Sequence, residues 1–381
     1  MSSKINNIGD GGNSALSNIS LSGRLFLTFN YDDNDENNDK HNIQNERTEL
    51  KISKTLDYGK YVITLKKGSG NSIKFKDVGF YYSFNDNLTL AIGYLALPYS
   101  MEDDMNEGTR TRIGTSTYWF ETNTGVLGDG GGVGAYLSYL TNQYGIHFGV
   151  VGNDLDDSEE RVNEVANTEH YLSYSGKSQM TISSRAYVAP YVTDSSAVMI
   201  GATGFYRKFG ESYSGTGTVD NNKTYANEFT KFSGEFMAVF NNFALLGEYM
   251  AGKVKVSNES QEWKEKGFNL YDYYVQASYV LTGENYGYDS GYFDSYKVAN
   301  PVNEGGFGSF ELFAGYYVDD FSKENRALGN KTNTITAGLN WSPLNQFRLF
   351  FTYNNIEVEA GKADGSDNKY NEYKVSARLF F

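Results

Sequence analysis

The feature that most constrains this chain is an apolar and polar alternation with a period of two, which recurs along its whole length. In the segment YYVQASYVLT, Tyr273, Val275 and Ala277 fall on one face. Gln276 and Ser278 fall on the other. Successive side chains of a β-strand point to opposite faces, so this period indicates strands rather than helices. We therefore predict an all-β fold.

Segments with this pattern predict sixteen strands. They lie at residues 22–32, 45–54, 59–66, 76–85, 87–96, 132–140, 143–152, 179–190, 196–208, 229–241, 243–255, 270–282, 307–318, 331–342, 345–357 and 370–381. So many strands without an interrupting linker favour one closed barrel, which would use residues 1–381 as a single domain.

The connections between the predicted strands alternate in length. After even-numbered strands most are tight, as at 241–242, whereas after odd-numbered strands they are long, polar and acidic, as at 33–44. Barrels of the bacterial outer membrane have this asymmetry, with short periplasmic turns and long external loops. We therefore predict a 16-stranded antiparallel transmembrane β-barrel. A soluble β-sandwich, which also alternates, is the alternative fold.

The apolar faces of the predicted strands carry no charged residue at their central positions. A lysine or arginine that faces lipid at the bilayer midplane costs ~2–4 kcal/mol, so this exclusion indicates contact with lipid. The chain has 32 tyrosines and 25 phenylalanines, and many outward tyrosines fall near strand ends. Aromatic girdles at both membrane interfaces are typical of such barrels. The polar faces would then line a water-filled lumen.

Composition excludes several classes of function. The chain has no cysteine, so it forms no disulfide and has no thiolate metal site or cysteine nucleophile. Its net charge is −14 and it has no basic stripe, which argues against nucleic-acid binding. The histidines, His41, His147 and His170, accompany no serine-nucleophile signature, phosphate loop or HExxH motif. We expect no enzymatic activity.

At the strand positions whose side chains are expected to point into the lumen, basic residues outnumber acidic ones. The predicted basic wall consists of Arg24, Arg47, Lys51, Lys60, Lys66, Arg185, Arg207, Arg348, Lys374 and Arg378. The inward acids are fewer: Glu49, Asp77, Glu235, Glu248 and Glu311. A basic wall in a narrow passage of low dielectric favours anions. The alternative is that these bases and acids pair across the wall and only fill it.

The longest connection, residues 97–131, is too long and too mixed in composition for a simple surface loop. It contains the aromatic run Tyr118, Trp119 and Phe120, which is poorly placed in bulk water. We predict that it folds into the barrel and forms a constriction. The candidate filter residues are Arg110 and Arg112, opposed by the acids Glu102, Asp103, Asp104, Glu107 and Glu121. The alternative is a loop that stays outside and caps the pore.

Three other regions complete the predicted organisation. Residues 283–306 follow the twelfth strand, so parity predicts a long periplasmic connection. Residues 1–21 are predicted to be a polar N-terminal periplasmic segment and show no signal-peptide pattern. The acidic stretches 32–39 and 153–160 lack EF-hand spacing. We expect them to be solvated external loop tips, with at most weak Ca²⁺ binding that bridges them to lipopolysaccharide, and we expect no cofactor.

Several motifs make the chain resemble the phosphate-selective porins of the O and P type. The most specific is YYVQASYVLTGENYGY, in which a strand is followed by Leu281-Thr282-Gly283-Glu284. Shorter motifs resemble the family's first strand, the start of its constriction loop, its strand after the long connection and its penultimate hairpin. These are GRLFLTFNYDD, IGYLALPYSMEDD, GGFGSFELFAGYY and LNWSPLNQFRLFFTYNN. The resemblance spans nearly the whole chain.

The resemblance implies a homotrimer of sixteen-stranded barrels in a Gram-negative outer membrane, a folded-in constriction loop and passive diffusion of anions, sometimes phosphate. Two departures weaken the expectation for phosphate. Ala96 stands where family members often carry a base, and the constriction loop has more acids than bases. We therefore predict a weakly anion-leaning porin for small hydrophilic solutes. The alternatives are a cation-preferring or carbohydrate channel and a plugged structural or adhesin barrel.

Overall fold

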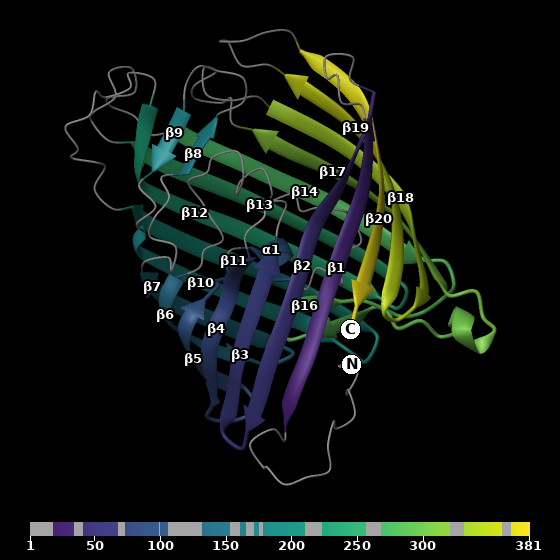
Figure 1. The fold of residues 1–381 in the computed structure, drawn as a ribbon, viewed down its shortest axis with the longest axis horizontal. Coiled ribbons are helices and arrows are strands. Elements are labelled where there is room, and N and C mark those ends of the chain that lie inside the picture. Colours follow the sequence, from purple (N-terminus) through teal and green to yellow (C-terminus); the bar gives the residue numbers. More distant parts are fainter. Residues whose placement is uncertain are drawn as a thin grey trace.

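The computed structural model describes residues 18–33, 41–67, 73–98, 100–105, 132–152, 161–164, 171–174, 178–209, 223–256, 268–320, 331–359 and 367–381. Eighteen strands form one sheet, and sixteen of them close into a barrel wall (Figure 1). The wall strands are β1(Ile19–Asp32), β2(His41–Leu56), β3(Gly59–Lys67), β4(Ile73–Ser83), β5(Leu88–Leu95), β6(Gly132–Leu140), β7(Tyr144–Gly152), β10(Ser178–Val192), β11(Ser196–Phe209), β12(Lys223–Phe240), β13(Phe243–Val256), β14(Phe268–Val280), β17(Ser309–Asp320), β18(Lys331–Leu344), β19(Phe347–Glu359) and β20(Asn368–Phe380).

All sixteen predicted strands are confirmed, with bounds that differ by a few residues. Each wall strand pairs antiparallel with its neighbours along the chain, and β20 returns to pair with β1 from Arg24↔Phe380 to Asp32↔Glu372. The backbone of Gly23 adds two hydrogen bonds with Phe381 to this seam, of 2.8 and 3.0 Å. Closure leaves no unpaired edge among the sixteen described wall strands, which a transmembrane sheet requires because lipid cannot satisfy backbone polar groups.

Alternation along the strands sorts the side chains as the sequence predicts. In β1, Leu27, Phe29 and Tyr31 are exposed on the outer surface, whereas Phe26 and Thr28 are buried on the inner side. Aromatic side chains lie next to one another across neighbouring strands on the outside. The ring centroids of Tyr31 and Tyr373 are 6.1 Å apart, and those of Tyr373 and Tyr353 are 5.4 Å apart. The outer surface is therefore an apolar and aromatic belt.

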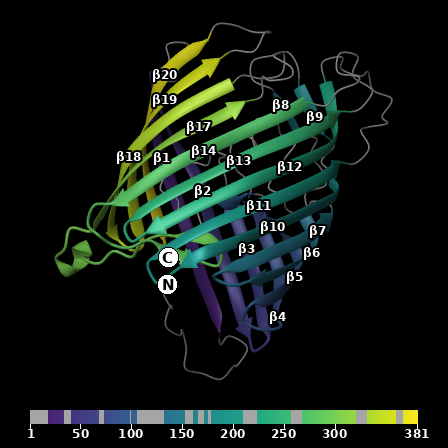
Figure 2. The same ribbon diagram turned by 180° about the vertical axis from the view of Figure 1, so that it is seen from behind.

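In the described part of the chain, four short strands and two helical turns lie outside this wall pattern. β8(Arg161–Glu164) pairs with β9(Tyr171–Tyr174), and β9 runs parallel to β12. β15(Gly287–Asp289) and β16(Tyr292–Asp294) form a separate hairpin between β14 and β17. α1(Met101–Asp104) follows β5, and η1(Val302–Glu304) precedes β17. Figure 2 shows the wall from behind, with β10 to β14 crossing it obliquely.

Residues 283–306, for which strand parity predicts a long periplasmic connection, have a fold of their own. The segment leaves the wall after β14 and rejoins it at β17, yet its first part turns into the barrel. Tyr286, Phe293 and Tyr296 are almost completely buried against inward side chains of the wall. Four tyrosines in this segment account for the inward turn, because aromatic side chains gain more from this interior than from water.

Candidate channel lining

An arginine and a glutamate form a fully buried pair on the inner wall. Arg185 of β10 donates from Nε to Glu235 Oε2 at 2.9 Å and to Oε1 at 3.2 Å. Its Nη2 lies 2.9 Å from the same Oε2. Thr203 Oγ1 donates to Glu235 Oε1 at 2.6 Å. Charge-assisted bonds of this kind compensate for the loss of water around both charges.

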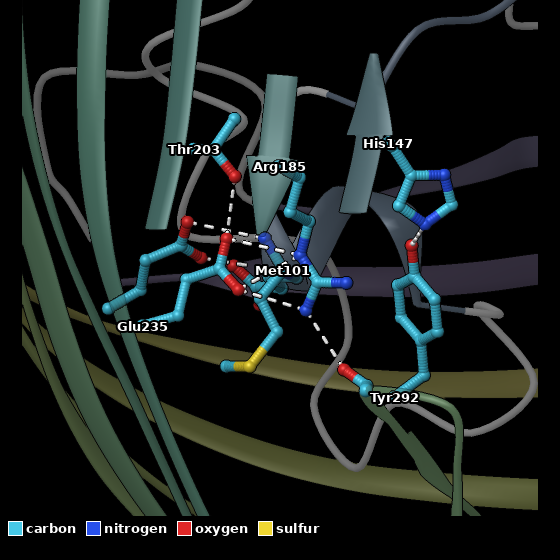
Figure 3. Close-up of polar contacts among 9 residues, drawn as sticks. Met101, His147, Arg185, Thr203, Glu235 and Tyr292 are labelled. Carbon is cyan, nitrogen blue, oxygen red and sulfur yellow. Dashed lines mark hydrogen bonds and ion pairs between the residues drawn. The ribbon is translucent and has the colours of Figure 1, made fainter. Parts of the chain in front are cut away.

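Arg185 also holds the β15–β16 hairpin inside the barrel (Figure 3). Its Nη2 donates to the carbonyl oxygen of Gly291 at 2.9 Å, and its guanidinium lies 4.4 Å from the ring centroid of Tyr292. Gly291 has φ +85°, and a Cβ there would come within 2.5 Å of the Tyr187 ring, so the position requires glycine. The hairpin turn is therefore fitted to this wall.

A histidine forms a further contact of the hairpin. The Tyr292 hydroxyl lies 3.2 Å from His147 Nε2, and His147 Nδ1 lies 3.0 Å from Ser138 Oγ. The sequence shows no catalytic signature that accompanies His147. Here it links β6, β7 and the hairpin by hydrogen bonds.

The lumen contains an apolar cluster that joins two segments from opposite ends of the barrel. Met101 and Met105, which follow β5, belong to it together with Tyr286, Phe293 and Tyr296 of the hairpin segment. Polar atoms of these tyrosines are satisfied at the wall. The Tyr286 hydroxyl donates to Glu311 Oε1 at 2.5 Å, for example. This part of the lumen is therefore packed like a protein core.

The start of the predicted constriction loop lies against the inner wall. The backbone amides of Met101 and Glu102 lie 3.3 and 3.4 Å from the two carboxylate oxygens of Glu248. Ser183 Oγ donates to the carbonyl oxygen of Pro98. The Asp103 and Asp104 side chains and all of Glu107, Arg110 and Arg112 lie outside the described residues. The filter assigned to these residues stays a prediction.

Buried acids occupy the wall of β12 to β14 and β17. Glu235, Glu248, Asp272 and Asp319 are each at most 5% exposed, and so is Glu102 of α1, which lies against Glu248. Asp272 and Asp319 are directly opposite each other on β14 and β17. The inward list drawn from the sequence omitted both. Asp272 lies on the same face of its predicted strand as Gln276, so the sequence could have identified it as inward. Asp319 lies just beyond the end of the predicted strand 307–318, so the alternation did not cover it. Within the described ranges, no group of three acidic or histidine side chains is arranged to hold a metal ion.

The wall of β1 to β4 is basic and more open. Glu49 is only 4% exposed and accepts from Arg24 Nε at 2.5 Å and from Lys76 Nζ at 3.1 Å. Lys51 and Lys60 are exposed on this inner face, and Lys60 Nζ lies 5.4 Å from the ring centroid of Tyr81. This inner face therefore combines the accessible positive charges of Lys51 and Lys60 with the buried carboxylate of Glu49.

Four of the remaining predicted wall bases contact aromatic or polar side chains. The Arg378 guanidinium lies 4.1 Å from the Phe350 ring centroid, and that of Arg348 lies 4.9 Å from the Tyr296 ring centroid. Arg207 Nε donates to Thr181 Oγ1 at 3.0 Å, and Lys374 Nζ lies 3.0 Å from Glu372 Oε1. The Arg47 side chain lies outside the described residues. Stacking and pairing reduce what these cations offer to a solute.

Glu284 of the LTGE motif fixes the point where the chain leaves β14. Its carboxylate accepts from the hydroxyls of Thr282 and Ser309 and from the Ala299 amide, the last at 3.3 Å. Burial raises the pKa of this carboxyl, but the bonds from Ser309 and Thr282 outweigh burial and hold the pKa below its ordinary value. The motif therefore has a structural role that its sequence did not specify.

Comparisons with known proteins agree with this arrangement. Residues 20–381 match the family model described as phosphate-selective porin O and P. An uncharacterized protein of Caulobacter vibrioides is 28% identical over 107 residues, which are 28% of this chain and 22% of that protein. The chain thus spans about a fifth of the length of this curated relative.

Solved structures with very different sequences share the fold. An anion-selective porin from Comamonas acidovorans is 14% identical, with a TM-score of 0.57, over 95% of this chain and 99% of that one. The trimer form of OmpT, an outer membrane protein of Vibrio cholerae, is 12% identical, with a TM-score of 0.55, at the same coverages. Salmonella typhi OmpF, solved in complex with daunomycin, is 11% identical, with a TM-score of 0.56, over 95% and 97%. No helix among the described residues is long and apolar enough to cross a membrane.

Proposed function

Since this chain belongs to the phosphate-selective porin O and P family and is an outer-membrane porin, we propose that its channel weakly prefers anions and admits phosphate among its solutes. The function itself, diffusion of solutes through a barrel, involves no catalytic step. Selectivity in such channels comes from pore width and from the charges that line the passage.

The observation that carries the proposal is that two inward lysines are exposed whereas four inward acids are buried. Lys51 and Lys60 are exposed to the lumen. The acids Glu235, Glu248, Asp272 and Asp319 are nearly inaccessible on the opposite wall. A solute in water interacts more with an exposed ammonium group than with a carboxylate that protein covers. The accessible field of the described lumen therefore favours anions.

The preference is weak because the arginines are engaged. Arg185 is committed to Glu235 and Gly291, and Arg24 is committed to Glu49. A tight oxyanion site needs several charge-assisted donors that converge on one point. The lysines supply point charges on flexible stems instead. Phosphate would therefore pass or bind loosely rather than be held.

The constriction and the assembly belong to the same proposal. Loop 97–131 would narrow the channel, with Glu102, Asp103, Asp104 and Glu107 opposing Arg110 and Arg112. The contact of its first residues with Glu248 supports this placement. A homotrimer in contact with outer-membrane lipid and lipopolysaccharide is proposed from the family and from the trimer form of the Vibrio cholerae protein.

The test is the reversal potential of the purified protein in a planar bilayer under a KCl gradient, with and without added phosphate. We expect a chloride-directed potential and partial block of the current by phosphate. The double substitution Lys51→Gln and Lys60→Gln should move the potential toward zero. Lys253 is exposed on the same outer face of β13 as Tyr249. Lys253→Gln should therefore leave the reversal potential unchanged.

Other outcomes separate the remaining functions. A potassium-directed potential without phosphate block would contradict the anion preference and favour a cation-preferring or carbohydrate channel. A folded protein with no conductance would instead favour a plugged structural or adhesin barrel.

A further inference from the structure

A compact lobe lies outside the barrel wall, in the part of the chain that connects the β15–β16 hairpin to β17. It comprises residues 299–308 and includes η1, and it is called the periplasmic lobe below. Figures 1 and 2 both show η1 displaced sideways from the wall, beside the ends of β17 and β18 where the short turns lie. In porins the short turns face the periplasm, which places the lobe on that side of the membrane.

Backbone contacts fix the shape of the periplasmic lobe. The Gly306 amide donates to the Pro301 carbonyl at 3.1 Å, and the Gly308 amide donates to the Asn300 carbonyl at 2.9 Å. Gly305 and Gly308 have φ values of +87° and +76°, which favour glycine. A Cβ at Gly306 would come within 2.1 Å of the Asn300 carbonyl oxygen. The turn is therefore tightly folded and holds its side chains in set directions.

The periplasmic lobe presents apolar side chains to its surroundings. Phe307 is 83% exposed and Val302 is 45% exposed. Keeping a phenylalanine side chain in water rather than in an apolar environment costs about 1.5–3 kcal/mol. A tight turn that fixes such a side chain outward indicates that something apolar covers it.

Phe307 is continuous with the lipid-facing surface of the barrel. Its carbonyl oxygen accepts from Trp341 Nε1 at 2.8 Å. The indole of Trp341 stacks on Phe310, with ring centroids 6.3 Å apart and an interplanar angle of 13°. Both rings lie on the outward parity at the periplasmic ends of β17 and β18, and Leu281 beside them is 52% exposed. Tryptophan at such a strand end marks the membrane interface.

We propose that the periplasmic lobe lies on the periplasmic leaflet of the outer membrane and inserts Phe307 and Val302 at the boundary between phospholipid headgroups and acyl chains. The lobe extends sideways over the leaflet rather than across the pore mouth. Glu304 is its only charged residue, and it is exposed, so it can remain in water while the two apolar side chains enter the interface. Burial of apolar area at this depth drives interfacial binding.

The absence of cysteine from the chain makes a site-directed test clean. Phe307→Cys is labelled with an environment-sensitive fluorophore and reconstituted into phospholipid vesicles, and Glu304→Cys on the same lobe serves as the matched control. We expect a blue-shifted emission at position 307 that is quenched by nitroxides on shallow acyl positions. Position 304 should instead be quenched by a water-soluble agent. Unchanged single-channel conductance of both labelled proteins establishes that the barrel is folded.

Two results would overturn the proposal. Equal quenching of both positions by the water-soluble agent would mean that the lobe projects into the periplasm. A blue shift at position 307 that persists in detergent micelles and disappears when the oligomer is dissociated would mean that a second copy of this chain covers Phe307. Neither result depends on the ion selectivity of the channel.

Discussion

At the scale of single residues, the buried charges of the inner wall stabilise the barrel only in combination. Glu235 has no exposed side-chain surface, and its stability there depends on Arg185 and Thr203. A buried charge that loses its partner keeps the full cost of its desolvation. Exposed pairs behave differently because water solvates each partner well.

This contrast gives a mutational prediction. Arg185→Met should lower the free energy of unfolding by about 3–5 kcal/mol, because it leaves the Glu235 carboxylate buried without its cation. Adding Glu235→Met to this variant should recover much of the loss. The urea midpoint of the folded barrel in detergent measures both effects. In the exposed Lys255 and Glu228 pair, Lys255→Gln should lower the free energy of unfolding far less, because water solvates Glu228 well without its partner. Additive losses in the double variant would contradict the prediction.

Glu284 predicts a pH dependence at the periplasmic side. Hydrogen bonds hold its folded-state pKa below the ordinary value of 4.5, so it contributes stability above that pH. The contribution is lost as the pH falls through the lower, folded-state pKa. The wild type should therefore lose more stability than Glu284→Gln between about pH 6 and about pH 3. Urea titrations across this range test the difference, and parallel curves for the two proteins would contradict it.

At the scale of elements, the β15–β16 hairpin fills part of the lumen from the periplasmic side. Arg185, His147 and the apolar cluster hold it from three directions. Its strands have three residues each, too few to show a period in sequence. Its position depends on the carbonyl oxygen of Gly291, which carries no sequence signal. Sequence reasoning found the segment by its length but missed its fold for this reason.

Replacing residues 287–294 by a glycine and serine linker should raise single-channel conductance, because it removes a packed element from the water path. Tyr288→Phe is the matched control, since it removes only a hydroxyl that donates to the Asn142 carbonyl at the surface. Phe293→Ala should destabilise the hairpin by about 3–5 kcal/mol and increase current noise. Unchanged conductance in a folded linker variant would show that the hairpin does not limit the passage.

At the scale of the whole molecule, alternation repeated over sixteen strands determines the barrel, which is why the fold could be predicted. The alternation identifies the apolar face of each strand separately, so a wrong assignment of one residue does not change the predicted closed wall. The lumen is less predictable. The sequence identifies Lys51 and Asp272 only as charged residues of inward parity, whereas the structure shows Lys51 exposed and Asp272 buried. That difference depends on the segments that fold into the barrel.

The exposure of Lys51 and Lys60 predicts how selectivity depends on ionic strength. Solvated charges are screened over about 30 Å at 0.01 M salt but over only about 3 Å at 1 M. At a constant concentration ratio across the bilayer, the chloride-directed reversal potential should therefore shrink as total KCl rises. The double substitution Lys51→Gln and Lys60→Gln should give a small potential at every concentration. A wild-type potential that does not change with salt would mean that buried or narrowly confined groups, such as Arg348 or Arg378 beneath their aromatic neighbours, set the preference instead.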